Sequence, residues 1–217
     1  MPDIYMNLVF EDALSGAVID KILAASRQTY SIRVRYNGGG YGWIKTKIGG
    51  FNNAAKAMPY FVLTDLDTCE CAPVLVRQWL GAPRHPNLLF RVAVREVEAW
   101  VLGCRESFAE FLGVPENRIP TNVDEIEDPK KLVINLARRS RKRDIRLDIV
   151  PRDGSTARVG PNYNGRLISF VKTNWDPAVA KERSLSLKKA ISVLDAFKPC
   201  LDTLRITTTG NAKFDRM

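Results

Sequence analysis

Residues 60–71, YFVLTDLDTCEC, join an apolar run to two closely spaced aspartates and two closely spaced cysteines. The run has no polar residue other than a threonine before Asp65, which is typical of a strand buried on both faces of a parallel sheet. Ligands bind such sheets outside the carboxyl ends of the strands. The stretch therefore predicts a central strand and a candidate site where that strand ends.

Strand-like and helix-like patterns alternate on both sides of this stretch. Leu14, Val18 and Ile22 are spaced as on one helix face, with Ser15 as the expected N-cap. Glycines at 49 and 50 make a helix over 43–57 a weak one. The predicted strands are 4–10, 30–36, 60–66 and 87–94, with helices at 14–26, 43–57, 72–80 and 96–103. This order predicts an α/β fold for residues 1–104, a doubly wound and mainly parallel sheet.

The second half predicts a different organisation. Asp128 and Asp176 each precede a proline, which is the pattern of an N-cap followed by the first helical residue. Residues 184–197 form a further amphipathic helix pattern that ends before Pro199. We therefore expect a basic, mainly helical extension over 105–205 that packs on the α/β core, and a tail over 206–217 without a clear pattern.

Charge is divided unevenly along the 217 residues, whose formal net charge is +9. Residues 1–128 contain 13 Lys and Arg against 16 Asp and Glu, and residues 129–217 contain 20 against 8. A basic half is typical of a protein with a polyanionic partner, because Lys and Arg that displace counterions supply much of the affinity for nucleic acid. A solvated basic surface is the alternative.

No stretch approaches the roughly 18 apolar residues of a membrane span, and no secretory signal begins the chain. Four cysteines without such a signal favour reduced thiols. These features predict a cytoplasmic protein with no membrane partner. The oligomeric state, including a homodimer, stays open.

Carboxylates follow two of the predicted strands. Glu11 and Asp12 follow the first strand, and Asp65 and Asp67 end the third. Strand side chains alternate between faces, so Asp65 and Asp67 are expected to point the same way. Carboxylate oxygens suit Mg²⁺ or Mn²⁺, which keep several waters and accept phosphate oxygens as further ligands. The alternative is that the aspartates only end a strand, where Asp is common.

A first strand ending in glutamate and a third ending in Asp-x-Asp resemble the Toprim domain of topoisomerases, bacterial primases, recombination mediators and overcoming-lysogenisation-defect nucleases. The resemblance implies that Glu11 is the general acid or base and that Asp65 and Asp67 bind Mg²⁺. The segments VAVREVEAWVLG, DPKKLV, YNGRLISFVKTNWDP and RSLSLKKAI further resemble a functionally uncharacterised bacterial family of Toprim-like proteins.

This chain departs from the Toprim pattern in two places. Asp12 stands where Toprim domains usually have a glycine, so either Glu11 or Asp12 could occupy the site. Cys69 stands near a position where a third carboxylate often follows. Glu96 and Glu98 follow the fourth strand at the start of a helix, where stabilisation of the helix dipole is sufficient to explain the presence of one of them. Glu98 is the candidate ligand for a second metal site.

Other motifs are weaker. Cys69 and Cys71 lack the spacing of a structural zinc site, and His85 is typical of a loop residue. The sequence NGGGYGWIK, 37–45, lacks the Gly-Lys-Ser/Thr of a phosphate-binding P-loop. We expect a flexible loop that could border the metal site because it follows a parallel strand.

The segment 130–143 carries a dense set of cations that could hold the phosphates of a nucleic acid. These residues are Lys130, Lys131, Arg138, Arg139, Arg141, Lys142 and Arg143.

The combined pattern predicts a Mg²⁺- or Mn²⁺-dependent enzyme that cleaves phosphodiester bonds, a nuclease acting on DNA or RNA. One alternative is a haloacid-dehalogenase-type phosphatase, with Asp65 as nucleophile and Asp67 as acid. Cys69 and Arg95 depart from that pattern. The other alternative is a nucleic-acid or nucleotide binding module without catalysis, in a defence or toxin system.

Overall fold

A four-stranded, all-parallel sheet forms the centre of the molecule, in the order β2-β1-β3-β4. The computed structural model describes residues 3–200, so the predicted tail 206–217 and the last residues of the predicted extension lie outside the described part. The strands are β1 (Ile4–Phe10), β2 (Tyr30–Asn37), β3 (Tyr60–Asp65) and β4 (Leu88–Ala93). The predicted α/β class and parallel sheet are confirmed.

The register of the sheet brings the ends of β1, β3 and β4 together. Asn7 pairs with Tyr60 between β1 and β3, and Asp65 pairs with Ala93 between β3 and β4. Tyr60 to Thr64 are buried, as the apolar run predicts for a central strand. Residues that follow these three strands therefore share one edge of the sheet.

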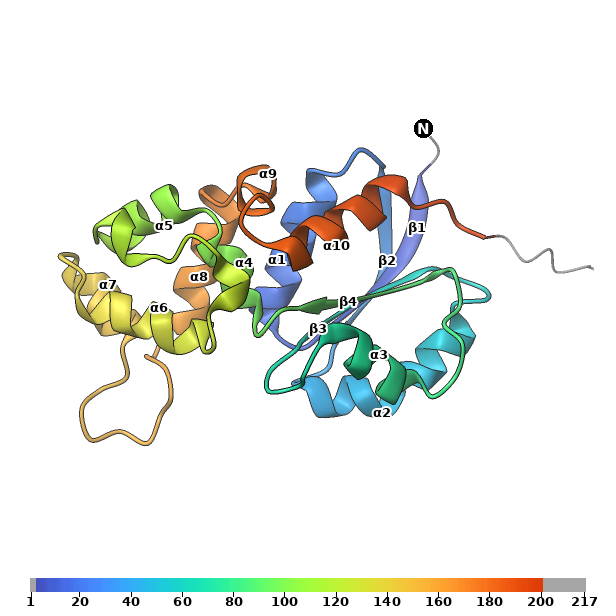
Figure 1. The fold of residues 1–217 in the computed structure, drawn as a ribbon, viewed down its shortest axis with the longest axis horizontal. Helices are drawn as coiled ribbons and strands as arrows, with labels where there is room; N and C mark the ends of the chain where they lie inside the picture. The colour runs from blue at the N-terminus through green and yellow to red at the C-terminus, as the bar shows by residue number, and fades with distance from the viewer. Residues whose placement is uncertain (1–2, 201–217) are drawn as a thin grey trace, which may run out of the picture.

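Helices cover both faces of the sheet (Figure 1). One face packs against α1 (Ala13–Ala24) and α10 (Leu185–Ala196), and the other packs against α2 (Tyr41–Ala54) and α3 (Ala72–Leu80). The glycine-containing helix predicted over 43–57 forms as α2. The N-cap predicted for α1 is wrong, because Asp12 and not Ser15 caps the helix by accepting a hydrogen bond from the Ser15 N–H.

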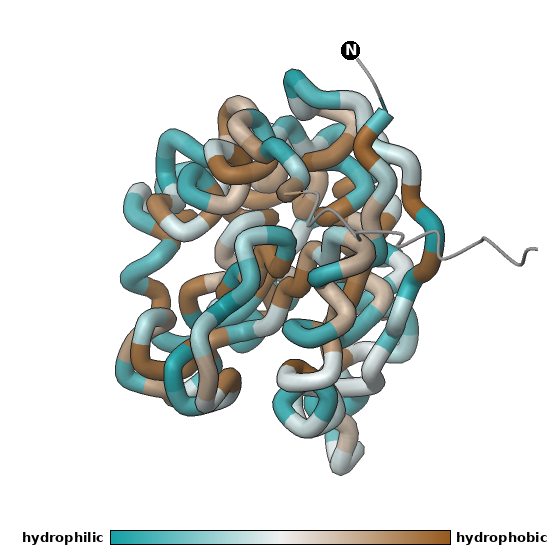
Figure 2. Tube along the Cα trace, turned by 90° about the vertical axis from the view of Figure 1, so that its right-hand side faces the viewer, coloured by the Kyte–Doolittle hydropathy of each residue, from teal (hydrophilic) through white to brown (hydrophobic). Residues whose placement is uncertain are grey.

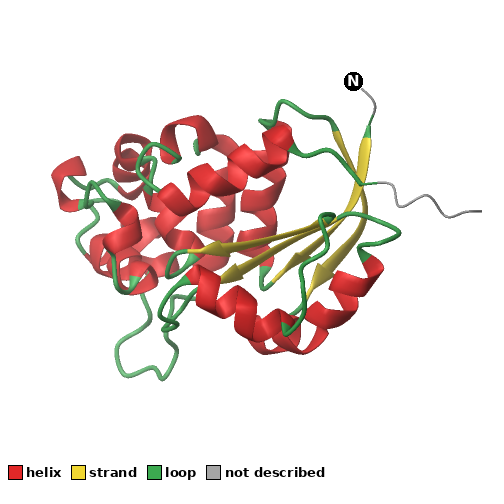
Figure 3. Cartoon of the chain, turned by 45° about the vertical axis from the view of Figure 1, so that its right-hand side comes forward, coloured by secondary structure: helices red, strands yellow, loops and turns green. Residues whose placement is uncertain are grey.

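The remaining helices lie beyond the carboxyl ends of the strands, toward which the strand arrowheads point in Figure 3. Asp128 and Asp176 cap helices that begin with proline, as predicted. The helices beyond the strand ends are α4 (Val97–Leu102), α5 (Arg105–Leu112), α6 (Pro129–Arg138), α7 (Arg143–Ile149), α8 (Tyr163–Thr173) and α9 (Pro177–Ala180), with short 3-10 helices at Glu116–Arg118 and Val123–Glu125.

One hydrophobic core runs from the α1 face of the sheet into these helices. Trp100 and Trp175 are its largest buried side chains, and the Trp175 indole N–H donates to the Trp100 carbonyl oxygen at 3.0 Å. Hydrophilic stretches lie along the outer loops in Figure 2. The helices beyond the sheet are thus held against it by shared apolar packing, which fixes α4 and α6 next to the ends of β3 and β4.

Within residues 3–200, no helix has the length and apolar character needed to cross a membrane.

Candidate carboxylate site at the ends of the strands

A pocket of about 400 Å³ lies at the carboxyl ends of β1 and β3. Four predicted carboxylates line it, together with Lys130 from α6 and the glycine-rich loop after β2. The predicted position of that loop beside the carboxylates is confirmed. The residues that line the pocket are Glu11, Asp12, Ala13, Asn37, Gly39, Gly40, Asp65, Asp67 and Lys130.

Glu11 is held against the neighbouring strand β3. Its Oε1 accepts a hydrogen bond from the Thr64 hydroxyl and one of 2.9 Å from the Asp65 N–H. Burial raises the pKa of Glu11, and the charges of Asp67 and Asp12 add to this rise against the opposing effect of the two hydrogen bonds. A carboxyl group whose pKa lies above its ordinary range can hold or release a proton closer to neutral pH.

Asp65 lies at the centre of the carboxylate group. The Val97 N–H at the start of α4 donates to its Oδ1 at 2.9 Å, which ties the end of β3 to the helix that follows β4. Burial raises the pKa of Asp65 well above its ordinary value, and the negative charges of Glu98 and Glu11 raise it further. Asp65 thus has a carboxylate on each side.

Asp67 reaches the pocket by a different route from the predicted one. Strand β3 ends at Asp65 and Asp67 has a φ of 48°, so the alternation of strand side chains does not apply to this pair. Both residues nevertheless line the same pocket, as predicted. Arg95 also has a positive φ of 60°, and its carbonyl oxygen accepts from the Asp67 N–H at 2.9 Å. The Arg95 guanidinium donates back to the Asp67 carbonyl oxygen at 3.0 Å. Asp67 and Arg95 thus both adopt the left-handed backbone conformation, which costs a non-glycine residue of order 1 kcal/mol. The hydrogen bonds between them fix the loop that contains Asp67.

Glu98 is buried beside the pocket, close enough to act on Asp65, and does not line the pocket itself. Its side chain is 2% exposed, with the Lys130 ammonium 3.5 Å from Oε1 and the Tyr163 hydroxyl donating to Oε1 at 3.1 Å. Burial raises the pKa of Glu98 to about 7, although the Lys130 charge opposes the rise. Burial alone would lower the pKa of Lys130, but the carboxylates of Glu98 and Glu96 outweigh it and raise that pKa.

Asp12 has a structural role that competes with metal binding. Its Oδ1 accepts from both the N–H and the hydroxyl of Ser15, each at 2.8 Å, as the N-cap of α1. Glu96 is the N-cap residue of α4 by position, and it pairs with Lys130 at 3.4 Å. Capping a helix does not by itself require either side chain to face the pocket. Of the two residues, only Asp12 lines the pocket.

The donor set suits a hard divalent cation, although the side chains do not converge on one point. Within residues 3–200, no group of three or more His, Cys, Asp or Glu side chains is arranged to hold a metal ion. Oε1 of Glu11 and Oδ1 of Asp65 accept the hydrogen bonds described above. The second oxygen of each carboxylate accepts none of these bonds. Buried carboxylates with raised pKa values are the group that a divalent cation would stabilise most.

A groove of about 610 Å³ adjoins the pocket and shares Asp67 and Lys130 with it. Five cations and four carboxylates line this groove, so its charge is mixed. The cations are the predicted Lys130, Lys131 and Arg138 together with Arg95 and Arg158, and the carboxylates are Asp67, Glu96, Glu127 and Asp128. The pocket and the groove thus adjoin each other between the sheet and α6.

The other predicted cations lie elsewhere. Arg139, Arg141 and Arg143 are exposed and do not line the groove. The Lys142 ammonium donates to the carbonyl oxygens of Glu110 at 2.7 Å and Phe111 at 3.2 Å, at the end of α5. Lys142 therefore satisfies the last carbonyls of a helix, a structural role that the sequence did not indicate.

Four residues of the site were not identified from the sequence. Thr64 is a buried polar residue in an otherwise apolar strand, and a polar residue at such a position could have indicated a hydrogen-bonding role in the site. Arg95, Tyr163 and Arg158 come from the end of β4, from α8 and from the loop before α8, and their local sequence carries no such signal.

The cysteines form no site in the described part of the chain. Cys69, Cys71 and Cys104 are free thiols, and the buried Cys104 thiol donates to the Asp176 carbonyl oxygen at 3.1 Å. Cys104 therefore acts in the packing of α9 against the end of α4.

Comparisons with known proteins found no family model, no curated protein and no solved structure that matches this chain.

Proposed function

We propose that the protein is a Mg²⁺- or Mn²⁺-dependent enzyme that cleaves phosphodiester bonds in DNA or RNA. The observation that carries the proposal is the single pocket lined by Glu11, Asp65 and Asp67 beside a groove lined by Lys131 and Arg138. An acidic site needs a cation, and the five cations among the residues that line the adjoining groove could contact the phosphates on either side of a reacting bond. The proposal includes a Toprim-like doubly wound core, 1–104, with a basic helical extension, 105–205.

The metal would be held by Asp65 and Asp67, with Glu98 or Asp12 as candidates for further ligands. These carboxylates fit the cation in donor type, since all are hard oxygen donors, and the raised pKa values of Asp65, Asp67 and Glu98 favour a compensating charge. Once bound, the cation would polarise a phosphate oxygen and stabilise the charge that develops there. Because the carboxylates do not converge on one point, binding would require them to move closer together.

Glu11 would transfer the proton. Its raised pKa and its position beside Asp65 support a role as general acid or base at near-neutral pH. Thr64 and the Asp65 N–H orient the carboxyl group by donating to one oxygen, which leaves the other for the proton.

Lys130 would keep the carboxylates ionised before a cation or substrate arrives. It lies 3.4 Å from Glu96 and 3.5 Å from Glu98 and lines both the pocket and the groove. Lys131, Arg138 and Arg158 would contact the phosphate backbone, where cations supply affinity without reading sequence.

The proposal is tested with labelled single-stranded DNA, duplex DNA and RNA in the presence of Mg²⁺ or Mn²⁺. We expect cleavage by the wild type, and a loss of more than about 100-fold for Asp65→Asn and for Asp67→Asn, since even outer-shell partners of a metal contribute 10- to 100-fold. The matched control is Asp20→Asn, which changes an exposed aspartate paired with Arg35 at 2.6 Å. This control should cleave as the wild type does.

Two outcomes would refute the proposal. Cleavage by Asp65→Asn and Asp67→Asn at the wild-type rate would remove the metal mechanism. Binding of nucleic acid with a steep salt dependence, but no cleavage with either metal, would favour the binding module instead.

A further inference from the structure

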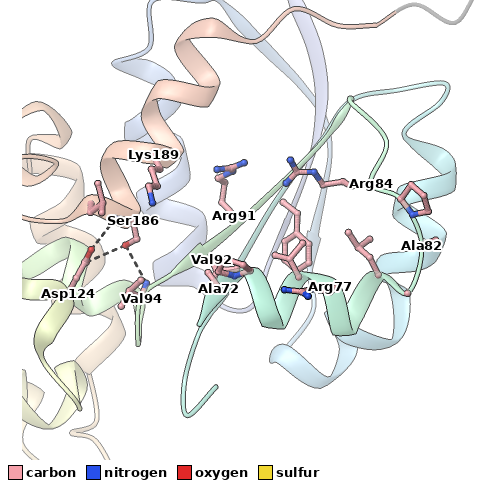
Figure 4. Close-up of a pocket in the computed structure, with 17 residues that line it drawn as sticks. Ala72, Arg77, Ala82, Arg84, Arg91, Val92, Val94, Asp124, Ser186 and Lys189 are labelled. Atoms are coloured by element: carbon pink, nitrogen blue, oxygen red, sulfur yellow. Dashed lines mark hydrogen bonds between the residues drawn. The ribbon is translucent and has the colours of Figure 1, made fainter. Parts of the chain in front are cut away.

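A second and larger cavity lies along the free edge of the sheet, away from the carboxylates. It has a volume of about 910 Å³, within the range of roughly 300 to 1,000 Å³ that is usual for small-molecule sites. Strand β4 forms its floor, with α3 on one side and the start of α10 on the other (Figure 4). We call it the edge groove.

Apolar side chains cover the α3 side of the edge groove. Val76 and Leu80 from α3 face Phe90 and Val92 from β4. Phe90 and Val92 belong to the hydrophobic cluster on that face of the sheet. This side therefore offers a surface suited to a flat apolar group.

Cations gather above the apolar side. Figure 4 shows Arg84, Arg91 and Lys189 on the same side of β4, while Arg77 lies on α3. The Nε of Arg91 is buried and has no hydrogen-bond partner among the described residues. Burial lowers the pKa of Arg91, and the neighbouring Arg84 lowers it further.

These cations have no compensating carboxylate. The ion pairs of residues 3–200 involve none of the four. Asp124 is the carboxylate that lines the groove, and it already accepts hydrogen bonds from the Ser184 and Ser186 hydroxyls and from the Ser186 N–H. Arg77, Arg84 and Lys189 are exposed, so the half-buried Arg91 is the one of the four for which an anion from outside the chain would offset a cost of burial.

The backbone of β4 adds hydrogen-bonding groups to the floor. Tyr60 N–H donates to the Asn87 carbonyl oxygen, and Leu66 N–H donates to that of Ala93, so the odd-numbered residues of β4 face β3. Backbone groups alternate along a strand, and the N–H and C=O of Phe90 and Val92 therefore face the edge groove. At its end the groove is closed by Val94, whose N–H donates to the Ser186 hydroxyl at 3.3 Å.

We propose that the edge groove binds a nucleoside phosphate, with the phosphates on Arg84, Arg91 and Lys189 and the base against Phe90 and Val92. The outward N–H and C=O groups of β4 supply the donor and acceptor that the edge of a base requires. An apolar surface, a line of alternating donors and acceptors and a group of unpaired cations meet in one cavity, and this combination matches a nucleotide better than a purely apolar ligand or a free phosphate. The site is separate from the carboxylate pocket and does not rest on the proposed function.

The test is isothermal titration of the full chain with ATP in EDTA, so that no metal occupies the carboxylate pocket. We expect Arg91→Met and Lys189→Met to weaken ATP binding by about 10-fold or more, the loss expected for a charge-assisted hydrogen bond. The matched control is Lys188→Met, which makes the same change on the adjacent residue of α10, outside the edge groove. It should leave the Kd within about twofold, since exposed ion pairs contribute little.

Hydrogen exchange provides a second readout. ATP should slow the exchange of the Phe90 and Val92 N–H groups, which a structural role of Arg91 alone would not do. The double variant Asp65→Asn and Asp67→Asn should bind ATP as the wild type does, which separates this proposal from the nuclease proposal.

Four results would overturn the proposal. The first is no ATP binding by the wild type, and the second is equal weakening by Lys188→Met and Lys189→Met. The third is pyrophosphate or adenosine binding as tightly as ATP, because the site would then recognise an anion or an apolar ring but not a nucleotide. Protection of β4 without ATP that grows with protein concentration would also contradict it, by assigning the groove to a second copy of the chain.

Discussion

Replacement of Glu98 by glutamine should stabilise the metal-free protein at pH 8 and leave its stability almost unchanged at pH 5. Glu98 is buried, and its pKa rises from an ordinary value of 4.5 to about 7 because of that burial. Glutamine has the same shape and can still accept the hydrogen bond that Tyr163 donates at 3.1 Å. The variant therefore removes a buried charge while it keeps the packing.

The magnitude follows from the two pKa values. Each pKa unit corresponds to about 1.4 kcal/mol, so ionisation of Glu98 in the folded state costs roughly 3 kcal/mol relative to the unfolded chain. The folded state holds the proton more tightly, which means that wild-type stability decreases as the pH rises from about 4.5 to about 7. The pKa of about 7 already includes the attraction of Lys130, so we expect a gain of about 3 kcal/mol at pH 8, or a Tm increase of roughly 6 to 12 °C for a chain of this size.

Urea and thermal unfolding in EDTA at pH 5, 6, 7 and 8 measure this difference. Tyr163→Phe is the companion variant, because loss of the donor to Glu98 should move the pH-dependent step upward. A destabilised Glu98→Gln protein at pH 8, or a gain that is equal at pH 5 and pH 8, would refute the view that ionisation of the buried Glu98 destabilises the folded state.

Three further changes follow from the same structure. Lys130→Met removes the ammonium from the carboxylates and should cost about 2 kcal/mol at pH 8, less than a fully buried pair because Lys130 is partly exposed; unfolding at pH 5 should show a smaller loss. Arg138→Gln should weaken nucleic-acid binding and lower the slope of log affinity against log salt by about one, measured by fluorescence anisotropy. Gly160→Ala should destabilise the folded protein by about 2 kcal/mol because the added Cβ would lie 2.4 Å from a backbone oxygen. Gly50→Ala, in open space on α2, should stabilise the folded protein by about 0.5 to 1 kcal/mol, and thermal unfolding measures both changes.

The sequence predicted those parts of the fold that depend on local patterns. The buried run before Asp65 became the central strand β3, and Asp128 with Pro129 began α6, because apolar continuity and capping are both encoded within a few residues. The parallel direction of the strands followed from the alternation of strands and helices, whereas the strand order was not predicted.

Asp67 lines the pocket beside Asp65 as predicted, but not because the strand continues to it. Strand β3 ends at Asp65, and a positive φ at Asp67, supported by Arg95, turns the chain. Aspartate tolerates this conformation better than most residues do, but the sequence does not reveal which aspartate adopts it.

The electrostatics of the site could not be predicted locally. Lys130 is 32 residues from Glu98 and was grouped with the cations of its own helix, yet its ammonium lies among carboxylates. Tyr163 reaches the same carboxylate from α8. Contacts of this kind depend on how α6 and α8 pack against the ends of the strands, which no pattern within a single segment specifies.

Crystals soaked in Mn²⁺ and measured near the manganese absorption edge show directly whether Asp65 and Asp67 bind a metal ion. We expect an anomalous peak between Asp65 and Asp67, with Glu11 close enough to act on a bound phosphate, and no such peak in Asp65→Asn crystals. A fully soaked wild-type crystal without a peak at these carboxylates, or with manganese bound at another place alone, would contradict it.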